Sequence, residues 1–191
     1  MSFNYKPSKY VLDKVREFAH KRVKGSSALY SSRGEKNLSK MEEDIIIGTL
    51  GEYAVQYYCK TIGLKCTRPD LKIYENRRKS FDADLTSVVR DKEIKLHVKS
   101  QSTNSIKRYG LSWLFQKSDS LVKSPDDEDM MVFCSVDPKV WEVTIVGFVH
   151  PKLVCELGLW GECSVPYYRH SKLAIYLEDL EPYAIVRSEL I

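Results

Sequence analysis

The chain has 191 residues, of which 43% are hydrophobic, 11% aromatic and 29% charged, as is typical of one globular domain of ordinary size. This composition excludes a wholly disordered or fibrous chain. No run of eighteen or more apolar residues occurs, so we expect no membrane span. The charge is uneven: residues 1–40 carry ten basic and three acidic residues, a balance of +7, and the other 151 residues sum to −3. We therefore expect a basic N-terminal arm that faces a polyanion and a more acidic body.

The N-terminus and the cysteines favour a cytoplasmic protein. The first ten residues, MSFNYKPSKY, lack the apolar core of a signal peptide. The five cysteines are odd in number, scattered and never in a CxxC pair, so they indicate neither a disulfide framework nor a zinc site. We expect them to be small buried hydrophobic side chains.

Two N-terminal segments have the periodicity of helices. Residues 8–23 place apolar side chains at helical spacing with basic residues between them. The stretch 25–40 is rich in Ser, Gly and Lys and has no period, so we expect a loop. Residues 42–62 repeat apolar side chains at the i, i+4 and i+8 positions, and Gly63 is placed to end this second helix.

A β-hairpin is predicted from residues 81–89 and 93–100, which flank a turn at 90–92. The second strand alternates strictly, with Ile94, Leu96 and Val98 on one face and Glu93, Lys95, His97 and Lys99 on the other. If Asp91 and Lys92 form a two-residue turn, opposed residues have numbers that sum to 183. This register places Asp84 opposite Lys99 and Asp82 opposite Gln101.

The other segments complete a layered α/β or α+β domain. We expect a short strand near 64–67, a polar basic loop over 100–109, an aromatic amphipathic segment at 111–122, an acidic turn at 126–129, and strands at 130–136 and 142–149. In the aromatic segment, Trp113, Leu114 and Phe115 are expected to be core residues and not a stacking platform. The chain divides into a basic N-terminal helix and loop (1–40), a core (41–150) and a C-terminal extension packed on the same domain (151–191).

An acid and a lysine would meet at the open end of this hairpin. Glu52, which lies in the preceding helix next to Gly51, would add a second carboxylate, because Gly48 and Gly51 indicate a close approach by a neighbouring segment. Clustered carboxylates repel one another unless a cation is bound, so the group either takes a hard divalent metal or pairs with Lys99. A bound Mg²⁺ would acidify a water for attack on a phosphodiester. The alternatives are a solvated Glu52 and a surface salt bridge between Asp84 and Lys99.

These residues resemble the PD-(D/E)XK nuclease superfamily, whose core runs helix, strand, strand, strand, helix, strand. The resemblance covers residues 42–149 and is carried by Gly51-Glu52, Asp84 and the segment HVKSQ at 97–101. It implies a restriction-endonuclease-like core, with a mixed central sheet of about four to five strands flanked by helices. It also implies a metal-dependent endonuclease, in which Asp84 binds Mg²⁺, Glu52 joins the metal shell and Lys99 is catalytic.

The chain departs from the family pattern at His97, where most members have Glu or Asp and some have Gln. Imidazole is a poor ligand for Mg²⁺ and a better one for Mn²⁺, which makes His97 a candidate metal ligand and Mn²⁺ the alternative ion. The same departure supports an alternative function, a nuclease-fold protein that binds nucleic acid or a protein partner without cutting. A literal Glu-x-Lys occurs at Glu93-Ile94-Lys95, but in the register above it lies beside the turn.

The resemblance implies DNA as the partner. Asp82 and Gln101 are expected at the substrate, and Lys107 and Arg108 follow the active-site strand where a backbone phosphate would pass. The basic N-terminal helix would supply non-specific affinity. Many restriction-type nucleases cut both strands as homodimers, and a homodimer remains open here.

Overall fold

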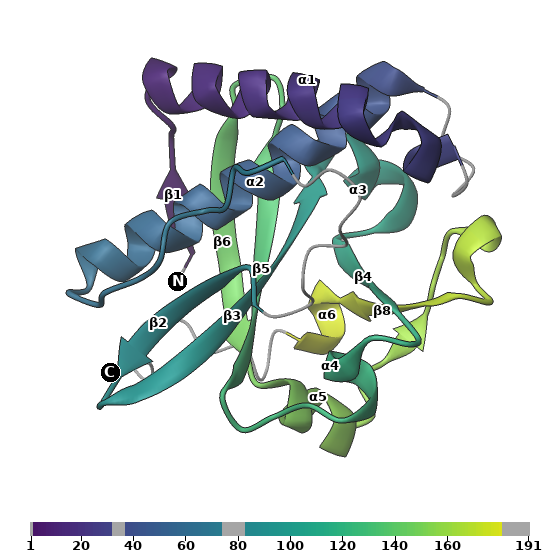
Figure 1. Cartoon of the computed structure of the whole chain (residues 1–191). Coiled ribbons are helices and arrows are strands. Elements are labelled where there is room, and N and C mark those ends of the chain that lie inside the picture. The colour runs from purple at the N-terminus through teal and green to yellow at the C-terminus, as the bar shows by residue number, and fades with distance from the viewer. Residues whose placement is uncertain (1, 32–36, 74–82, 181–191) are drawn as a thin grey trace.

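The computed structural model describes residues 2–31, 37–73 and 83–180, with the backbone alone described over 25–31. The strands form a five-stranded mixed sheet in the order β1-β6-β5-β3-β2 and a three-stranded sheet in the order β4-β8-β7 (Figure 1). The strands are β1 (Phe3–Tyr5), β2 (Leu85–Val89), β3 (Lys92–Ser102), β4 (Ser112–Gln116), β5 (Asp129–Asp137), β6 (Glu142–Val149), β7 (Gly161–Glu162) and β8 (Lys172–Tyr176). The helices are α1 (Lys9–Ser31), α2 (Leu38–Thr61), α3 (Thr103–Tyr109), α4 (Ser120–Lys123), α5 (Pro151–Glu156), the 3₁₀ helix η1 (Pro166–Tyr168) and α6 (Leu177–Leu180). The predicted mixed α/β class with a central sheet of five strands is confirmed.

The two long helices take up most of the stretch predicted as a loop over 25–40. α1 continues to Ser31, and α2 begins at Leu38 behind the N-cap Asn37, whose side chain accepts a hydrogen bond from the Lys40 backbone N–H at 3.1 Å. The prediction was wrong because it followed local propensity alone, and helices that pack on other helices override weak propensity. Gly63, at φ +80°, follows the end of α2 as predicted.

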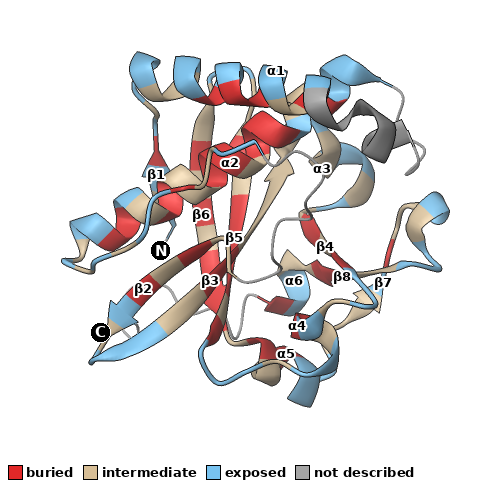
Figure 2. Ribbon diagram, in the orientation of Figure 1, coloured by how far each residue is buried: buried red, intermediate tan, exposed pale blue. Residues whose placement is uncertain are grey.

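α2 covers one face of the five-stranded sheet, and α1 lies on the outer side of α2 (Figure 1). The core between them is built from buried side chains of α1, α2 and the sheet, among them Val15, Leu50, Ala54, Leu96 and Val132. Figure 2 shows buried residues on α2 and on the strands β3, β5 and β6 that it covers. This packing fixes α2 against β3, which is the strand that carries the predicted site.

The three-stranded sheet and the short helices α5 and α6 pack on the other side of β5 and β6. Trp113 and Phe115 of β4 are buried in this second core, as predicted, together with Phe133, Ile175 and Leu180, whereas Leu114 is only half-buried. The Trp113 indole N–H donates a hydrogen bond to the Cys134 carbonyl at 2.9 Å, which joins the two sheets. Residues of the segment 151–180 thus share a core with β4, β5 and β6.

The β2–β3 hairpin has a different register from the predicted one. Leu85 lies opposite Leu96 and Val89 opposite Lys92, so the numbers of opposed residues sum to 181. The turn residues are Arg90 and Asp91, at φ +49° and +63°, because a tight hairpin turn of this kind needs positive φ at both positions and Asp tolerates it. Each residue therefore faces a partner two positions from the predicted one, which leaves the faces of β3 unchanged.

Three smaller predictions also need correction or refinement. The stretch 64–67 forms only an isolated bridge, between Cys66 and Ser87, and not a strand. The predicted basic loop over 100–109 is the end of β3 followed by α3, whose N-cap Ser102 accepts a hydrogen bond from the Asn104 backbone N–H. β3 and β5 are parallel neighbours, and the connection between them runs through α3, β4 and α4.

None of the helices in the described part of the chain is long and apolar enough to cross a membrane. Of the five cysteines, Cys59, Cys134 and Cys163 are buried, as expected for small hydrophobic side chains. Cys66 is half-buried and Cys155 is exposed, so the expectation fails for these two.

Candidate functional site

The alternation of β3 directs the predicted site residues to the face away from α2. Ile94, Leu96 and Val98 pack in the α2-side core, while Lys99 contacts Phe115 of β4 on the other face. The sequence prediction of which residues share each face of β3 is confirmed. His97 and Lys99 are therefore neighbours on one face, two residues apart along the strand.

Asp84 comes directly before β2, whose first pair with β3 is Leu85–Leu96. Its backbone N–H donates to the Leu96 carbonyl at 3.1 Å, and its carboxylate Oδ2 accepts the Val98 backbone N–H at 2.9 Å. Asp84 therefore lies beside the residues of β3 around His97, and not opposite Lys99 as predicted.

His97 has a partner that the sequence interpretation missed. Its Nε2 donates to Asp129 Oδ1 at 2.8 Å, and the two side chains are 11% and 8% exposed. Asp129 Oδ2 accepts the Asp126 backbone N–H at 2.8 Å, so both carboxylate oxygens are engaged. Asp129 belongs to the segment that was assigned to an acidic turn, and it reaches His97 because β5 lies parallel to β3. A buried carboxylate of this kind orients the imidazole and leaves Nδ1 available to a ligand.

Lys99 is held by an aromatic ring. Its ammonium nitrogen lies 4.9 Å from the centroid of the Phe115 ring, a cation–π contact. Lys99 forms no ion pair with any residue that the structure describes, so the predicted alternative of a salt bridge to Asp84 is not found there. Phe115 thus holds the ammonium of the half-buried Lys99 against the face of its ring.

Glu52 comes from the opposite side of the sheet. The preceding Gly51 packs against β3 so closely that an added β-carbon would overlap the Ser100 hydroxyl and lie 3.3 Å from Val98 Cγ1. The predicted close approach is therefore confirmed at Gly51, whereas Gly48 has no atom within 4 Å of that position. Glu52 itself is half-buried and lies next to this contact with β3.

The three predicted metal ligands are not gathered into one cage. Within residues 2–31, 37–73 and 83–180, no group of three or more His, Cys, Asp or Glu side chains is close enough to hold a metal ion. Asp82, the second acid of the hairpin, lies outside the described residues. Asp84 instead contacts the backbone of β3 on both sides of His97, and Lys99 follows on the face of His97.

The residues predicted to contact substrate have different surroundings. The Gln101 amide donates to the Gly110 carbonyl and accepts the Ser112 backbone N–H, both at 2.9 Å, and so fixes the connection between α3 and β4. Lys107 and Arg108 are exposed in the last turn of α3, and the Arg108 guanidinium lies 5.2 Å from the centroid of the Tyr109 ring. The two basic residues are thus accessible, while Gln101 has a structural role.

The alternative Glu-x-Lys lies where the sequence placed it, beside the turn. Glu93 is exposed opposite Val88. Lys95 forms an ion pair with Asp126 at 3.3 Å, and this hydrogen bond raises the pKa of the lysine. Lys95 is therefore engaged with the acidic turn before β5, together with the Lys152–Asp127 pair.

Comparisons of the chain with protein-family models, with curated proteins and with solved structures found no significant match.

Proposed function

We propose that the protein is a metal-dependent endonuclease that hydrolyses DNA phosphodiester bonds, built on a restriction-endonuclease-like core. The observation that supports this most is the placement of Asp84 beside the residues of β3 around His97, with Lys99 next on the face of His97. The chain shares with that class of nuclease a helix followed by an antiparallel strand pair whose second strand, β3, lies parallel to a later strand, β5, although two strands and not three precede the next helix.

The residues at this edge fit a hard cation that is held largely by water and phosphate oxygens. Mg²⁺ commonly takes only one or two protein carboxylates and completes its shell with water and substrate phosphate. Asp84 would hold the ion and His97 would add an imidazole ligand for Mn²⁺, whereas Glu52 lies on the opposite side of the sheet and stays outside this shell. The ion would supply an acidified water and would neutralise charge on the scissile phosphate.

Lys99 would stabilise the transition state at the phosphate, and Asp129 would orient His97. The Lys99 ammonium, positioned by Phe115, would stabilise the extra negative charge of the transition state. Asp129 would hold the His97 ring in one orientation, because its carboxylate is itself anchored by the Asp126 backbone N–H.

The surface around the site suits a polyanion. Lys107 and Arg108 on α3 would neutralise backbone phosphates beside the scissile bond, and the exposed lysines of α1, on the outer side of α2, would contact phosphates farther away. The five free cysteines fit a reducing, cytoplasmic setting for such an enzyme. Cleavage of both strands of a duplex would need a homodimer or two successive cuts.

The test is cleavage of supercoiled plasmid and single-stranded DNA with Mg²⁺ or Mn²⁺. We expect Lys99→Ala to lower the rate by at least about a hundredfold, as for other lost catalytic groups. Lys95→Ala is the matched control, because Lys95 lies on the same strand and face but pairs with Asp126, and it should leave the rate nearly unchanged. Failure of both metals to support cleavage that Lys99→Ala abolishes would refute the enzymatic function.

A second candidate function is a nuclease-fold protein that binds DNA without cutting it. The observation that favours it is the buried His97–Asp129 pair, which occupies the position of the usual acidic ligand with a side chain already bound to a partner. This function predicts salt-dependent DNA binding that Lys99→Ala leaves intact and no cleavage with either metal.

A further inference from the structure

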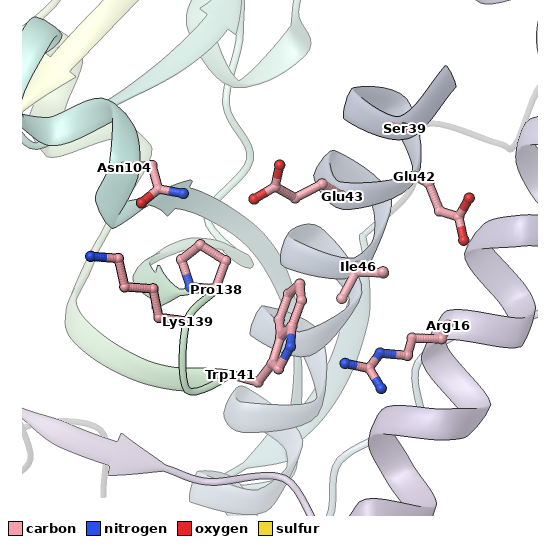
Figure 3. Close-up of a pocket in the computed structure, with 9 residues that line it drawn as sticks. All are labelled: Arg16, Ser39, Glu42, Glu43, Ile46, Asn104, Pro138, Lys139 and Trp141. Atoms are coloured by element: carbon pink, nitrogen blue, oxygen red, sulfur yellow. The ribbon is translucent and has the colours of Figure 1, made fainter. Parts of the chain in front are cut away.

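A pocket of about 540 Å³ lies beyond the carboxyl ends of the parallel strands β3 and β5 (Figure 3). β3 ends at Ser102 and is followed by Asn104 in α3, and β5 ends at Asp137 and is followed by Lys139. α1 and α2 form the other walls. Its lining includes Arg16, Glu43, Ile46, Asn104, Lys139 and Trp141. Ligands of layered α/β folds commonly bind at this end of parallel strands.

Trp141 has an unusual backbone conformation in this pocket. It is the last residue of the turn between β5 and β6 and has φ +53°, a region that bulky side chains rarely adopt. Residues held in such conformations gather at functional sites, because the surrounding structure must be built to maintain them. Here the result is a half-buried indole on the pocket wall, with the Arg16 guanidinium 5.7 Å from its ring centroid.

Three polar side chains that line the pocket form no polar contact that would stabilise the described part of the fold. Across the described part of the chain, the Glu43 carboxylate, the Asn104 side-chain amide and the Lys139 ammonium have no hydrogen-bond or ion-pair partner. Glu43 and Asn104 point toward one another across the pocket (Figure 3). Glu42, by contrast, faces His20 of α1, with its carboxylate 3.6 Å from the imidazole. The pocket therefore offers a flat aromatic wall, the Glu43 carboxylate, unpartnered among the described residues, beside that of Glu42, and several donors.

We infer that this pocket binds a single unpaired nucleobase of DNA and prefers cytosine. A base has two aromatic faces for stacking on the Trp141 indole, an interaction available in any single-stranded nucleic acid. Glu43 would accept the exocyclic amino group, as carboxylates do for cytosine N4, while Asn104 and Arg16 would donate to the carbonyl edge. Thymine has a carbonyl where cytosine has the amino group, so it would face the Glu43 carboxylate with an acceptor.

The inference rests on the proposed function for its ligand, since it takes DNA to be the substrate. Asn104 lies five residues beyond Lys99, which is about 15 Å along the chain. The bound base would therefore belong to a nucleotide a few positions from the scissile phosphate. The pocket would then add base preference to a site that otherwise contacts phosphates.

The test measures binding without metal, so that no cleavage occurs. The indole N–H signal of Trp141, assigned with Trp141→Phe, is followed in ¹H–¹⁵N spectra during titration with dCMP, dTMP and single-stranded oligo(dC) and oligo(dT). We expect oligo(dC) to shift the signal and to bind at least about fivefold more tightly than oligo(dT). Glu43→Ala should remove this preference, and the matched control Asp44→Ala, at an exposed residue of α2 that pairs with Lys40 and does not line the pocket, should keep it, provided that circular dichroism shows both variants folded.

Three results would overturn the inference: an unmoved Trp141 signal, equal affinity for the two oligonucleotides, or a preference that survives Glu43→Ala. A shift with free dCMP but none with oligo(dC) would also refute it, by indicating a site for free nucleotides. This test can fail or succeed independently of the test of the proposed function. A cytosine preference without metal-dependent cleavage would support the base-binding pocket and refute the endonuclease. Metal-dependent cleavage with an unmoved Trp141 signal would support the endonuclease and refute the base-binding pocket.

Discussion

His97 and Asp129 are the residues on which the interpretation of the site most depends. Both side chains are buried, and Asp129 accepts hydrogen bonds from the His97 ring and from the Asp126 backbone. Removal of one member of a buried hydrogen-bonded pair leaves the other without a partner, which costs more than the hydrogen bond itself is worth.

Asp129→Ala should therefore lower the free energy of unfolding by about 2 kcal/mol or more, as measured by urea denaturation. The matched control is Asp127→Ala, two residues earlier. Asp127 is exposed and pairs only at the surface with Lys152, so its loss should change stability little. Equal losses from the two variants would show that the buried pair does not contribute as described.

The cysteines provide a pH-dependent prediction. A hydrogen bond from the Cys59 thiol lowers the pKa of Cys66, whereas burial raises the pKa of Cys134 to about 12. Because the thiolate is the reactive form, iodoacetamide should label Cys66 in the native protein, with a midpoint below the value of about 8.5 for a free thiol. Cys134 should stay unlabelled at pH 8 until the protein unfolds. Peptide mass spectrometry checks this, and native labelling of Cys134 at the rate of Cys66 would contradict it.

At the residue scale, the sequence predicted which face of β3 each side chain lies on, but not which residue each side chain contacts. The alternation of residues 93–99 correctly placed His97 and Lys99 on one face. It could not identify Asp129 as the partner of His97, because that contact joins residues 32 positions apart through the parallel pairing of β3 with β5. Periodicity reports which way a side chain points and carries no information on which segment it meets.

The contact between α2 and β3 is the element-scale feature that positions Glu52. Gly51→Ala should destabilise the protein by about 1–3 kcal/mol, because the new methyl group would overlap the Ser100 hydroxyl and crowd Val98. Gly48→Ala, one turn earlier with open space around it, should stabilise the helix by about 0.5–1 kcal/mol. Thermal unfolding of both variants measures the difference. Stabilisation by both substitutions would show that the helix and strand are not in close contact at Gly51.

The sequence predicted the β2–β3 hairpin and its turn segment, but not the register in which the two strands pair. Three residues, Arg90 to Lys92, were assigned to the turn, and they allow more than one two-residue turn with different registers. The turn residues are Arg90 and Asp91 because both adopt positive φ there. This choice places Asp84 beside the residues of β3 around His97 and not opposite Lys99, and nothing in the local sequence pattern distinguishes the two arrangements.

At the scale of the whole molecule, the uneven charge predicts how DNA binding depends on salt. α1 carries exposed lysines on its outer surface, among them Lys14 and Lys21. If both neutralise phosphates, the double substitution Lys14→Ala/Lys21→Ala should weaken binding and reduce the slope of log affinity against log salt by about two. Lys60→Ala/Lys123→Ala, which also removes two exposed lysines, should have a smaller effect. Equal slopes for the two double variants would indicate that α1 is not the binding surface.

The mixed α/β class of the fold could be predicted from the sequence, but the three-stranded sheet could not. The order of helices and strands in residues 42–149 indicated a mixed sheet with α2 against it. The three-stranded sheet depends on β4 pairing with β8, two segments separated by more than fifty residues. Such long-range pairing is determined by the complete core around Phe115 and Phe133, which no single segment encodes.

The most direct test of the account compares the Mg²⁺-dependent cleavage of plasmid DNA by wild type, Asp84→Asn and Asp91→Asn. Asp84 contacts β3 beside His97, whereas Asp91 lies in the exposed turn of the same hairpin, where Asn also tolerates positive φ. The account predicts that wild type and Asp91→Asn cleave at similar rates and that Asp84→Asn is slower by at least about a hundredfold. No cleavage by the wild type, or equal cleavage by all three, would contradict it.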